Sequence, residues 1–252
     1  MTLSPSEAAG TWFTDRYVPA VFESAPAFQG RDGVVRVGVS HADSQEHRTS
    51  PYSAAFYNTQ GRKYDAGGGD GSYIEFSLYI PQSWSDPANV FANTSMWTTV
   101  VDDLNAISAY PIIGFTNFGA AGARLRVWDS NIGYVNLATA LNYDEWTALR
   151  LSVSGSNIEY SVNGANVYTA NTGSPASFRD VMLQVYNFGA AFDPGNTLGN
   201  TSMGMANNPS GYSYDAYWQS SAATPEPGTW TLALAGLGAA AWFKRRNLAK
   251  RP

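Results

Sequence analysis

The sequence predicts an all-β fold, a two-sheet antiparallel sandwich, followed by a single C-terminal helix. Apolar and polar residues alternate with a period of two in many short runs before residue 220, and Gly, Pro, Asn and Asp separate these runs. The body has no long stretch with the 3.6-residue period of a helix. Because many strands without intervening helices pack as two layers, we expect a sandwich domain at residues 1–220, a linker at 221–228 and a hydrophobic helix with a basic end at 229–246.

The strand with the clearest alternation is Ser72–Ile80, in which four apolar residues alternate with polar and aromatic ones. Residues 148–170 repeat this pattern as three strands joined by two tight turns, Gly155-Ser156 and Asn163-Gly164. Asn-Gly between alternating runs is a strong hairpin signal, because a type I′ turn needs a positive φ at both central residues.

The same alternation predicts further strands, in chain order at Val34–Ser40, Met96–Val101, Ile112–Asn117, Arg124–Asp129, Asp180–Asn187 and Tyr212–Gln219. The segments 65–71 and 192–210 are rich in Gly, Asn and Pro and are expected to be loops. The side chains expected in the core are Ile74, Phe76, Leu78, Leu151, Val153, Ile158, Tyr160, Val162, Leu183 and Trp218.

The C-terminal tail has a different character. Pro225-Glu226-Pro227 interrupts regular structure, because proline neither continues a helix nor donates to a sheet ladder. An uncharged run, Thr229–Phe243, follows, and then Lys244-Arg245-Arg246. An apolar segment with a basic flank is typical of a membrane segment whose basic end stays in the cytoplasm. The 15-residue run makes roughly 22 Å of helix, short of the ~30 Å hydrocarbon core, which favours a transient sorting segment over a permanent anchor or a core helix.

The triplet, Gly228, the apolar run and the basic end together resemble the PEP-CTERM sorting signal of Gram-negative bacteria, over Thr224–Arg246. The resemblance implies an exported protein whose tail enters the inner membrane transiently. It also implies recognition by an exosortase, a membrane-embedded peptidase, and a final place at the cell surface or in the extracellular matrix. The N-terminus has neither the basic nor the apolar region of an export signal, so we expect the true start to lie upstream or the chain to be trimmed.

The composition of the body argues against several function classes. Residues 1–224 contain 10 basic and 19 acidic residues, a formal net charge of −9, and Lys63 is their only lysine. Nucleic acid and anionic lipid both need basic surfaces, so neither is an expected partner. The chain has no cysteine, which excludes disulfides, Cys-based zinc sites and a Cys nucleophile.

Residues 145–153 and 158–168 resemble concanavalin A-like, laminin-G-type jelly rolls. In these domains a Trp opens a strand and a hairpin contains a Val-Asn-Gly turn, as Trp146 and Val162-Asn163-Gly164 do here. The segment Tyr214–Trp218 is similar to the closing strand of such domains. The resemblance implies a curved sandwich whose concave sheet often binds glycans.

The acids and histidines do not form a recognisable catalytic motif. Laminarinase-like enzymes on this fold carry a Glu-x-Asp-x-x-Glu strand, whose spacing puts the acid and the nucleophile on one face, and the sequence lacks this motif. We therefore expect Asp102-Asp103 and Asp144-Glu145 to be surface or turn residues, and His41 and His47 to be loop residues.

Calcium is the one metal for which the sequence offers ligands, and no other cofactor is expected. Calcium takes several carboxylate and carbonyl oxygens from loops. Asp65 with Asp70, or Asp193 with Asn196, would supply such oxygens, although neither pair follows an EF-hand pattern.

A candidate ligand surface comes from two predicted strands. Arg124, Arg126 and Trp128 point away from the core on one strand, and Gln184 and Tyr186 do so on the other. Aromatic platforms beside planar polar groups suit sugars, whose C–H faces stack and whose hydroxyls need partners, although the outer face of any aromatic-rich sandwich carries such residues. The sequence thus favours a non-catalytic exported protein that binds glycan or exopolysaccharide. The alternative is a glycoside hydrolase or polysaccharide lyase with dispersed catalytic residues.

Overall fold

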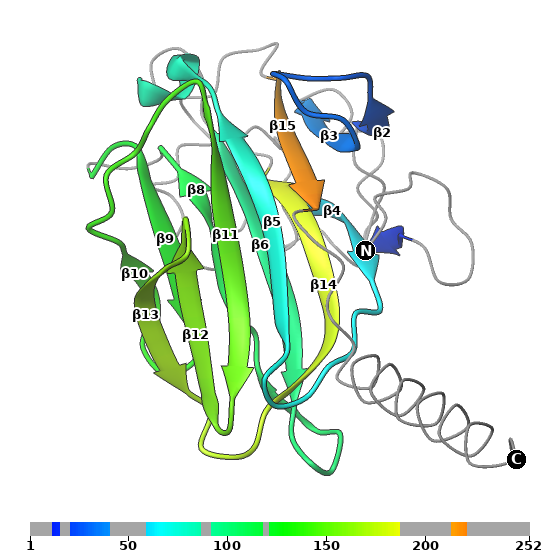
Figure 1. Cartoon of the computed structure of the whole chain (residues 1–252), viewed down its shortest axis with the longest axis vertical. Coiled ribbons are helices and arrows are strands. Elements are labelled where there is room, and N and C mark those ends of the chain that lie inside the picture. Colours follow the sequence, from blue (N-terminus) through cyan, green and yellow to red (C-terminus); the bar gives the residue numbers. More distant parts are fainter. Residues whose placement is uncertain are drawn as a thin grey trace, which may run out of the picture.

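The computed structural model describes residues 12–15, 21–40, 59–86, 92–117, 121–186 and 213–220. These residues form two antiparallel sheets that face one another, and their only helix is the short 3-10 helix Gln82–Ser85 (Figure 1). The predicted all-β, two-sheet antiparallel sandwich is therefore confirmed. The predicted tail helix, the two histidines and the segment 192–210 lie outside the described residues.

Sheet A has eight strands. Seven of them pair side by side in the order β1 (Phe13–Asp15), β4 (Thr59–Tyr64), β14 (Ser177–Tyr186), β6 (Asn93–Val101), β8 (Ile112–Thr116), β9 (Arg124–Asp129) and β10 (Gly133–Asn136). The eighth, β7 (Ile107–Ala109), also pairs with β6.

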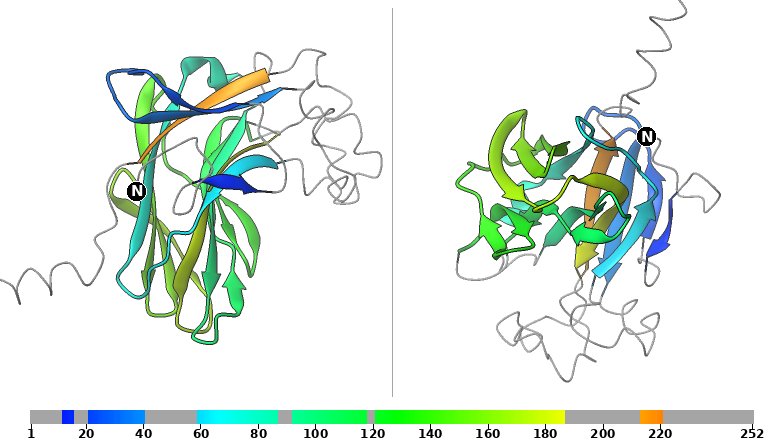
Figure 2. Two further views of the ribbon diagram at one scale, coloured as in Figure 1. Left: turned by 90° about the vertical axis from the view of Figure 1, so that its right-hand side faces the viewer. Right: turned by 90° about the horizontal axis from the view of Figure 1, so that it is seen from below.

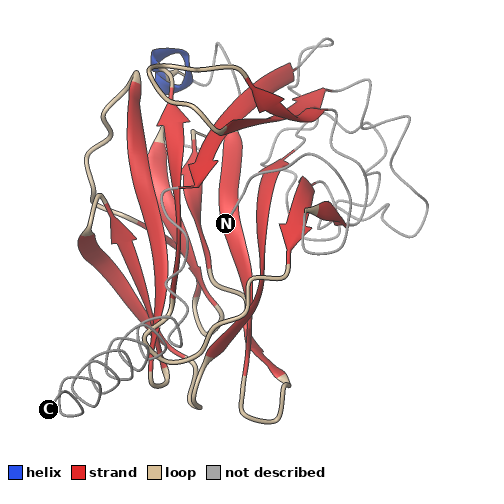
Figure 3. Cartoon of the chain, turned by 45° about the vertical axis from the view of Figure 1, so that its right-hand side comes forward, coloured by secondary structure: helices blue, strands red, loops and turns tan. Residues whose placement is uncertain are grey.

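Sheet B has seven strands. Their order is β13 (Ala165–Asn171), β12 (Asn157–Val162), β11 (Glu145–Ser154), β5 (Tyr73–Ile80), β15 (Ser213–Ser220), β3 (Val34–Ser40) and β2 (Val21–Ala25). Strand β15 comes from the far end of the body and lies between β5 and β3, so the sheet is complete only when this distant segment has joined it. Figure 2 shows the two sheets as separate layers, and Figure 3 shows that strands dominate the described part of the chain.

The core lies between the sheets and is built from the alternating apolar positions. All ten side chains predicted to be buried are at most 3% exposed, and Trp12, Trp218, Tyr160, Phe76 and Phe115 are the bulkiest fully buried ones. Burying this much apolar area provides the main stabilisation of a domain that has no disulfides.

The predicted hairpins at residues 148–170 are also confirmed, as β11, β12 and β13. Asn163 and Gly164 both have positive φ, 49° and 82°, as a type I′ turn requires. The sequence prediction omitted β1, β2, β4, β7 and β10, which are short or lack a clear alternation of apolar and polar residues. Within the described residues, no helix has the length and apolarity needed to cross a membrane.

Candidate functional site

A line of large side chains crosses the outer face of sheet A, the face turned away from the core. Antiparallel pairing places these side chains directly opposite one another on successive strands, so that they form a row perpendicular to the strands. In order across the sheet, the row is Phe13, Lys63, Met182, Trp97, Ile112, Trp128 and Tyr134. With neighbouring strands about 4.8 Å apart, the row spans roughly 29 Å.

Aromatic residues gather in the half of this row that ends at β10. We define the platform as Trp97, Trp128 and Tyr134 of the row together with Tyr110 and Arg126, which lie beside them. Tyr110 precedes β8 and contacts Trp97 edge to face, with ring centroids 6.0 Å apart. Trp128 contacts Tyr134 in the same way at 4.9 Å. Tyr110 and Tyr134 are 40% and 47% exposed, so the platform offers aromatic surface to solvent.

The three residues predicted on β9 lie on this outer face and are half-buried. The guanidinium carbon of Arg126 lies 3.8 Å from the centroid of the Tyr134 ring. Arg124 Nε donates to Asn136 Oδ1 over 2.7 Å, and an Arg124 Nη1 hydrogen bond reaches the Gly122 carbonyl. The pKa of Arg124 is lowered, first by burial and then by the positive charge of Arg126.

The predicted position of Gln184 is correct in its sheet but wrong in its exposure. Strands β14 and β9 both belong to sheet A, with β6 and β8 between them. Gln184 is on the outer face but only 5% exposed, because it belongs to a central strand, and its Nε2 donates to Ser95 Oγ on β6 over 2.8 Å. Tyr186 ends β14, and its side chain is outside the described part of the structure.

One carboxylate, Asp180, is present among the described outward-facing side chains on the strands of sheet A. Asp180 is 4% exposed, and its Oδ2 lies 3.2 Å from Lys63 Nζ and 3.0 Å from Arg179 Nε. Charge-assisted contacts to two cations fix a carboxylate in position. Asp180 is therefore a structural anchor for the sheet.

Two tyrosines of sheet B form hydrogen bonds to the C-terminal end of β9. Tyr160 donates its hydroxyl to the Trp128 carbonyl over 2.7 Å, and Tyr168 donates to Asp129 Oδ2 over 2.7 Å. Asp129 Oδ1 accepts from the backbone N–H of Asn131 in the β9–β10 turn. These bonds fix the backbone that carries Trp128 and so orient the platform.

Of the other acids singled out in the sequence, Asp102 and Asp144 are turn residues, whereas Glu145 is the exposed first residue of β11. Asp102 Oδ1 accepts from the backbone N–H groups of Leu104 and Ala106, so it caps the β6–β7 turn. Asp144 Oδ1 accepts from the Gln82 backbone N–H and the Tyr79 hydroxyl.

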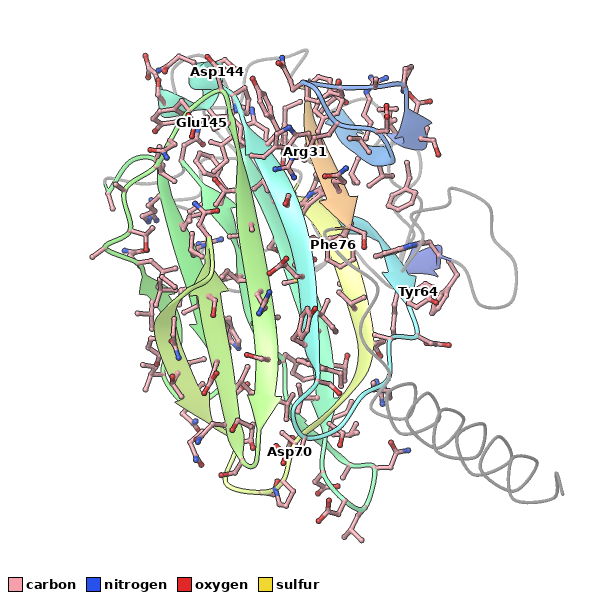
Figure 4. The ribbon with its side chains drawn as sticks, in the orientation of Figure 1. Arg31, Tyr64, Asp70, Phe76, Asp144 and Glu145 are labelled. Atoms are coloured by element: carbon pink, nitrogen blue, oxygen red, sulfur yellow. The ribbon has the colours of Figure 1, made fainter. Side chains whose placement is uncertain are left out.

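The two described calcium candidates, Asp65 and Asp70, are exposed. Asp70 Oδ1 accepts from the Gly155 backbone N–H, at the opposite end of the sandwich from Asp144 (Figure 4). No three His, Asp or Glu residues of the described segments gather in a way that would hold a metal ion. Asp193 and Asn196 fall outside those segments.

Sequence reasoning missed most of the platform. Trp97 lies on a strand that was predicted, but its partners across the sheet were unknown without the strand order. Tyr134 lies on β10, a four-residue strand, and Tyr110 lies in the β7–β8 connection. The Trp-Asp-Ser-Asn-Ile-Gly-Tyr stretch from Trp128 to Tyr134 contains the one available signal, a turn that returns the chain beside β9.

Comparison with known families identifies the tail. Residues 223–247 match the PEP-CTERM protein-sorting motif. This match confirms the resemblance found at Thr224–Arg246 and indicates an exported protein. No curated protein matches the chain.

Comparison with solved structures finds similar folds over most of the chain. A β-glucanase from Bacillus licheniformis has 17% identity and a TM-score of 0.46, covering 86% of this chain and 94% of that one. A glycoside hydrolase family 16 endo-glucanase from Bacteroides ovatus has 10% identity and a TM-score of 0.46, covering 85% and 95%. The carbohydrate-binding module CBM66 from Bacillus subtilis has 10% identity and a TM-score of 0.38, covering 82% and 94%. At these identities and scores, none of the three assigns an activity to this chain.

Proposed function

We propose that this chain is an exported protein that binds an extended polysaccharide without cleaving it, at the cell surface or in the extracellular matrix. The observation that carries the proposal is the platform, whose rings Trp97, Trp128 and Tyr134 lie in one row across sheet A and which is partly open to solvent. A sugar ring stacks its C–H face on an aromatic ring, and a row of such rings suits a linear polymer that lies across the strands. The sorting motif supports a site of action outside the cell.

The chemistry of the face supports binding over hydrolysis. Glycoside hydrolysis uses two carboxyl groups on opposite sides of the scissile bond, one as acid and one as base or nucleophile. Asp180, the carboxylate described on this face, is already held by Lys63 and Arg179, and it is almost fully buried. A carboxylate that is buried and engaged in this way is not within reach of a leaving group on a bound sugar.

Replacing Trp128 with alanine tests the proposal. Stacking on this ring contributes much of the expected affinity, because a rigid aromatic face buries a large area at low entropic cost. We expect Trp128→Ala in the full chain, kept in mild detergent, to abolish retardation in gels containing mixed-linkage β-glucan or polygalacturonate. Its thermal midpoint should change little, because Trp128 is half-buried on the outer face.

Tyr73→Ala is the matched control. Tyr73 is also a half-buried outward-facing aromatic residue with a guanidinium over its ring, that of Arg150 at 4.3 Å, but it lies on sheet B. The Tyr73→Ala variant should bind these polymers as the wild type does. Loss of binding in both variants would contradict a site on sheet A, and release of reducing ends from either polymer would show an enzyme.

A further inference from the structure

The platform carries positive charge beside its aromatic rings. Arg124 and Arg126 lie two residues apart on β9 and point to the same side, so their guanidinium groups share one part of the outer face. The charge of Arg126 contributes to the lowered pKa of Arg124, as expected for like charges at close range. Two guanidinium groups on the same part of a face together attract an anion more strongly than one does.

The two outer faces of the sandwich differ in charge. Among the outward-facing side chains that the structure describes on the strands of sheet A, four are cations, Lys63, Arg179, Arg124 and Arg126, and one is a carboxylate, Asp180. On sheet B, the two described strand arginines lie among three carboxylates: Arg150 Nε is 2.7 Å from Glu75 Oε2, and Arg36 contacts both Glu23 and Asp215.

This difference is notable because the body as a whole is acidic. Residues 1–224 have a formal net charge of −9. An excess of cations among the described side chains of one face is a local property of that face, and one of these cations, Arg126, lies over the Tyr134 ring of the platform. Local charge of this kind selects ligands of opposite charge and raises their concentration near the site.

The geometry places the charge where a stacked sugar would reach it. The Arg126 guanidinium lies over the Tyr134 ring, and Tyr134 is in edge-to-face contact with Trp128. A sugar that stacks on Trp128 therefore brings its substituents beside Arg126. The planar guanidinium makes paired hydrogen bonds to carboxylate or sulfate oxygens, which an uncharged hydroxyl does not offer.

From these observations we infer that the polysaccharide bound by sheet A is anionic, with carboxylate or sulfate groups along the chain. The inference rests on the proposed function, because it names the class of ligand for the same platform. Trp128 and Tyr134 contribute stacking, whereas Arg124 and Arg126 select charge.

Two pairs of polymers that differ only in charge test the inference. Polygalacturonate is compared with its fully methyl-esterified form, and dextran sulfate with dextran, by affinity gel electrophoresis of the full chain in mild detergent. We expect tighter binding to at least one charged member than to its neutral partner, with an affinity that falls as salt is added. The pair that shows the difference distinguishes carboxylate from sulfate recognition.

The double variant Arg124→Gln with Arg126→Gln should lose about tenfold in affinity for the charged polymer and most of its salt dependence. Arg150→Gln, which changes an outward arginine of sheet B, is the control and should bind as the wild type does. The basic end of the tail is the same in every variant, so any contribution that it makes to binding a charged polymer cancels when the variants are compared.

The outcomes separate the inference from the proposed function. Equal binding to charged and neutral members, or an unchanged affinity in the double variant, overturns the inference. If Trp128→Ala still abolishes that binding, the proposed function stands. Failure of the wild type to bind any of the four polymers counts against both.

Discussion

At the scale of single residues, the hydroxyl groups of two tyrosines determine how firmly the platform is held. Tyr160 is 1% exposed and donates to the Trp128 carbonyl. Its pKa is raised above the usual value, first by burial and then by the negative charge of Asp129. The pKa of Tyr168 is also raised, chiefly by its hydrogen bond to Asp129. Both groups keep their protons in the folded state at a pH where the unfolded chain begins to lose them.

Stability should therefore fall at alkaline pH, in part through Tyr160. Because its folded pKa lies above the unfolded value of about 10, its contribution is complete below about pH 10 and is lost as the pH rises further. Tyr160→Phe removes one hydrogen bond and should lower the free energy of unfolding by about 1 kcal/mol at neutral pH. The difference from the wild type should shrink above about pH 10 and reverse in sign by about pH 12, because only the wild type loses stability as this tyrosine ionises in the unfolded chain, measured by urea unfolding at each pH. A constant difference across this range would contradict the assignment.

Other residue-scale features could not be obtained from sequence. Alternation predicted that Arg126 and Trp128 face outward, because that depends only on the two-residue period of a strand. The stacking of Arg126 on Tyr134 depends on which strand pairs with β9 and in which register, which are tertiary facts. The burial of Gln184 likewise depends on the central place of β14 in sheet A.

At the scale of elements, the β2–β3 connection folds over the outer face of sheet B and forms an aromatic cluster there. Phe28 stacks on Tyr217, with centroids 3.7 Å apart and planes at 6°, and it meets Tyr79 edge to face at 5.2 Å. Trp146 donates its indole N–H to the Gln29 carbonyl, and Arg31 lies 4.7 Å over its ring. The cluster ties the tip of an N-terminal hairpin to β5, β11 and β15. Figure 4 shows Arg31 at this end of the sheet.

Truncating Phe28 should loosen this hairpin. Phe28→Ala removes the stacked ring, and because Phe28 is half-buried we expect a loss of about 2 kcal/mol, less than for a fully buried phenylalanine. Amide hydrogen exchange over residues 21–40 should become faster than in the wild type, while exchange in β8 and β9 should change little. Phe13→Ala, at a 37% exposed ring on sheet A, is the control and should leave exchange over 21–40 unaltered. Unaltered protection in Phe28→Ala would mean that β-pairing alone holds the hairpin.

The contrast between two hairpins shows which elements sequence can predict. Asn163-Gly164 lies between strongly alternating runs, and both the turn and its strands were predicted. The turn at Gln29-Gly30 also has two positive φ values, 47° and 73°, but Gln-Gly is a weak signal and β2 has no apolar alternation. Its conformation is supported by the contacts of Phe28, which bring together residues almost 190 positions apart in the chain.

At the scale of the whole molecule, the sandwich and the tail differ in how they can be recognised. The tail was identified from sequence alone, because a short ordered motif of triplet, apolar run and basic end does not depend on tertiary structure. The face of the sandwich that we propose to bind polysaccharide is a product of strand order, and it could be assembled only once the strands were placed. The order of strands also explains why β15, next to the linker, must be in place for sheet B to close.

The sorting motif predicts that an exosortase removes the tail after export. Replacing Pro225-Glu226-Pro227 with three alanines should leave an uncleaved, membrane-associated species in a host that has the enzyme, because the triplet is the part of the motif that interrupts regular structure before the apolar run. Intact-mass spectrometry of the membrane and surface fractions measures the cleavage. The body is unchanged in this variant, so its polysaccharide binding should match that of the uncleaved wild type. Wild-type protein recovered from the cell surface with its C-terminus still at Pro252 would contradict processing at this motif.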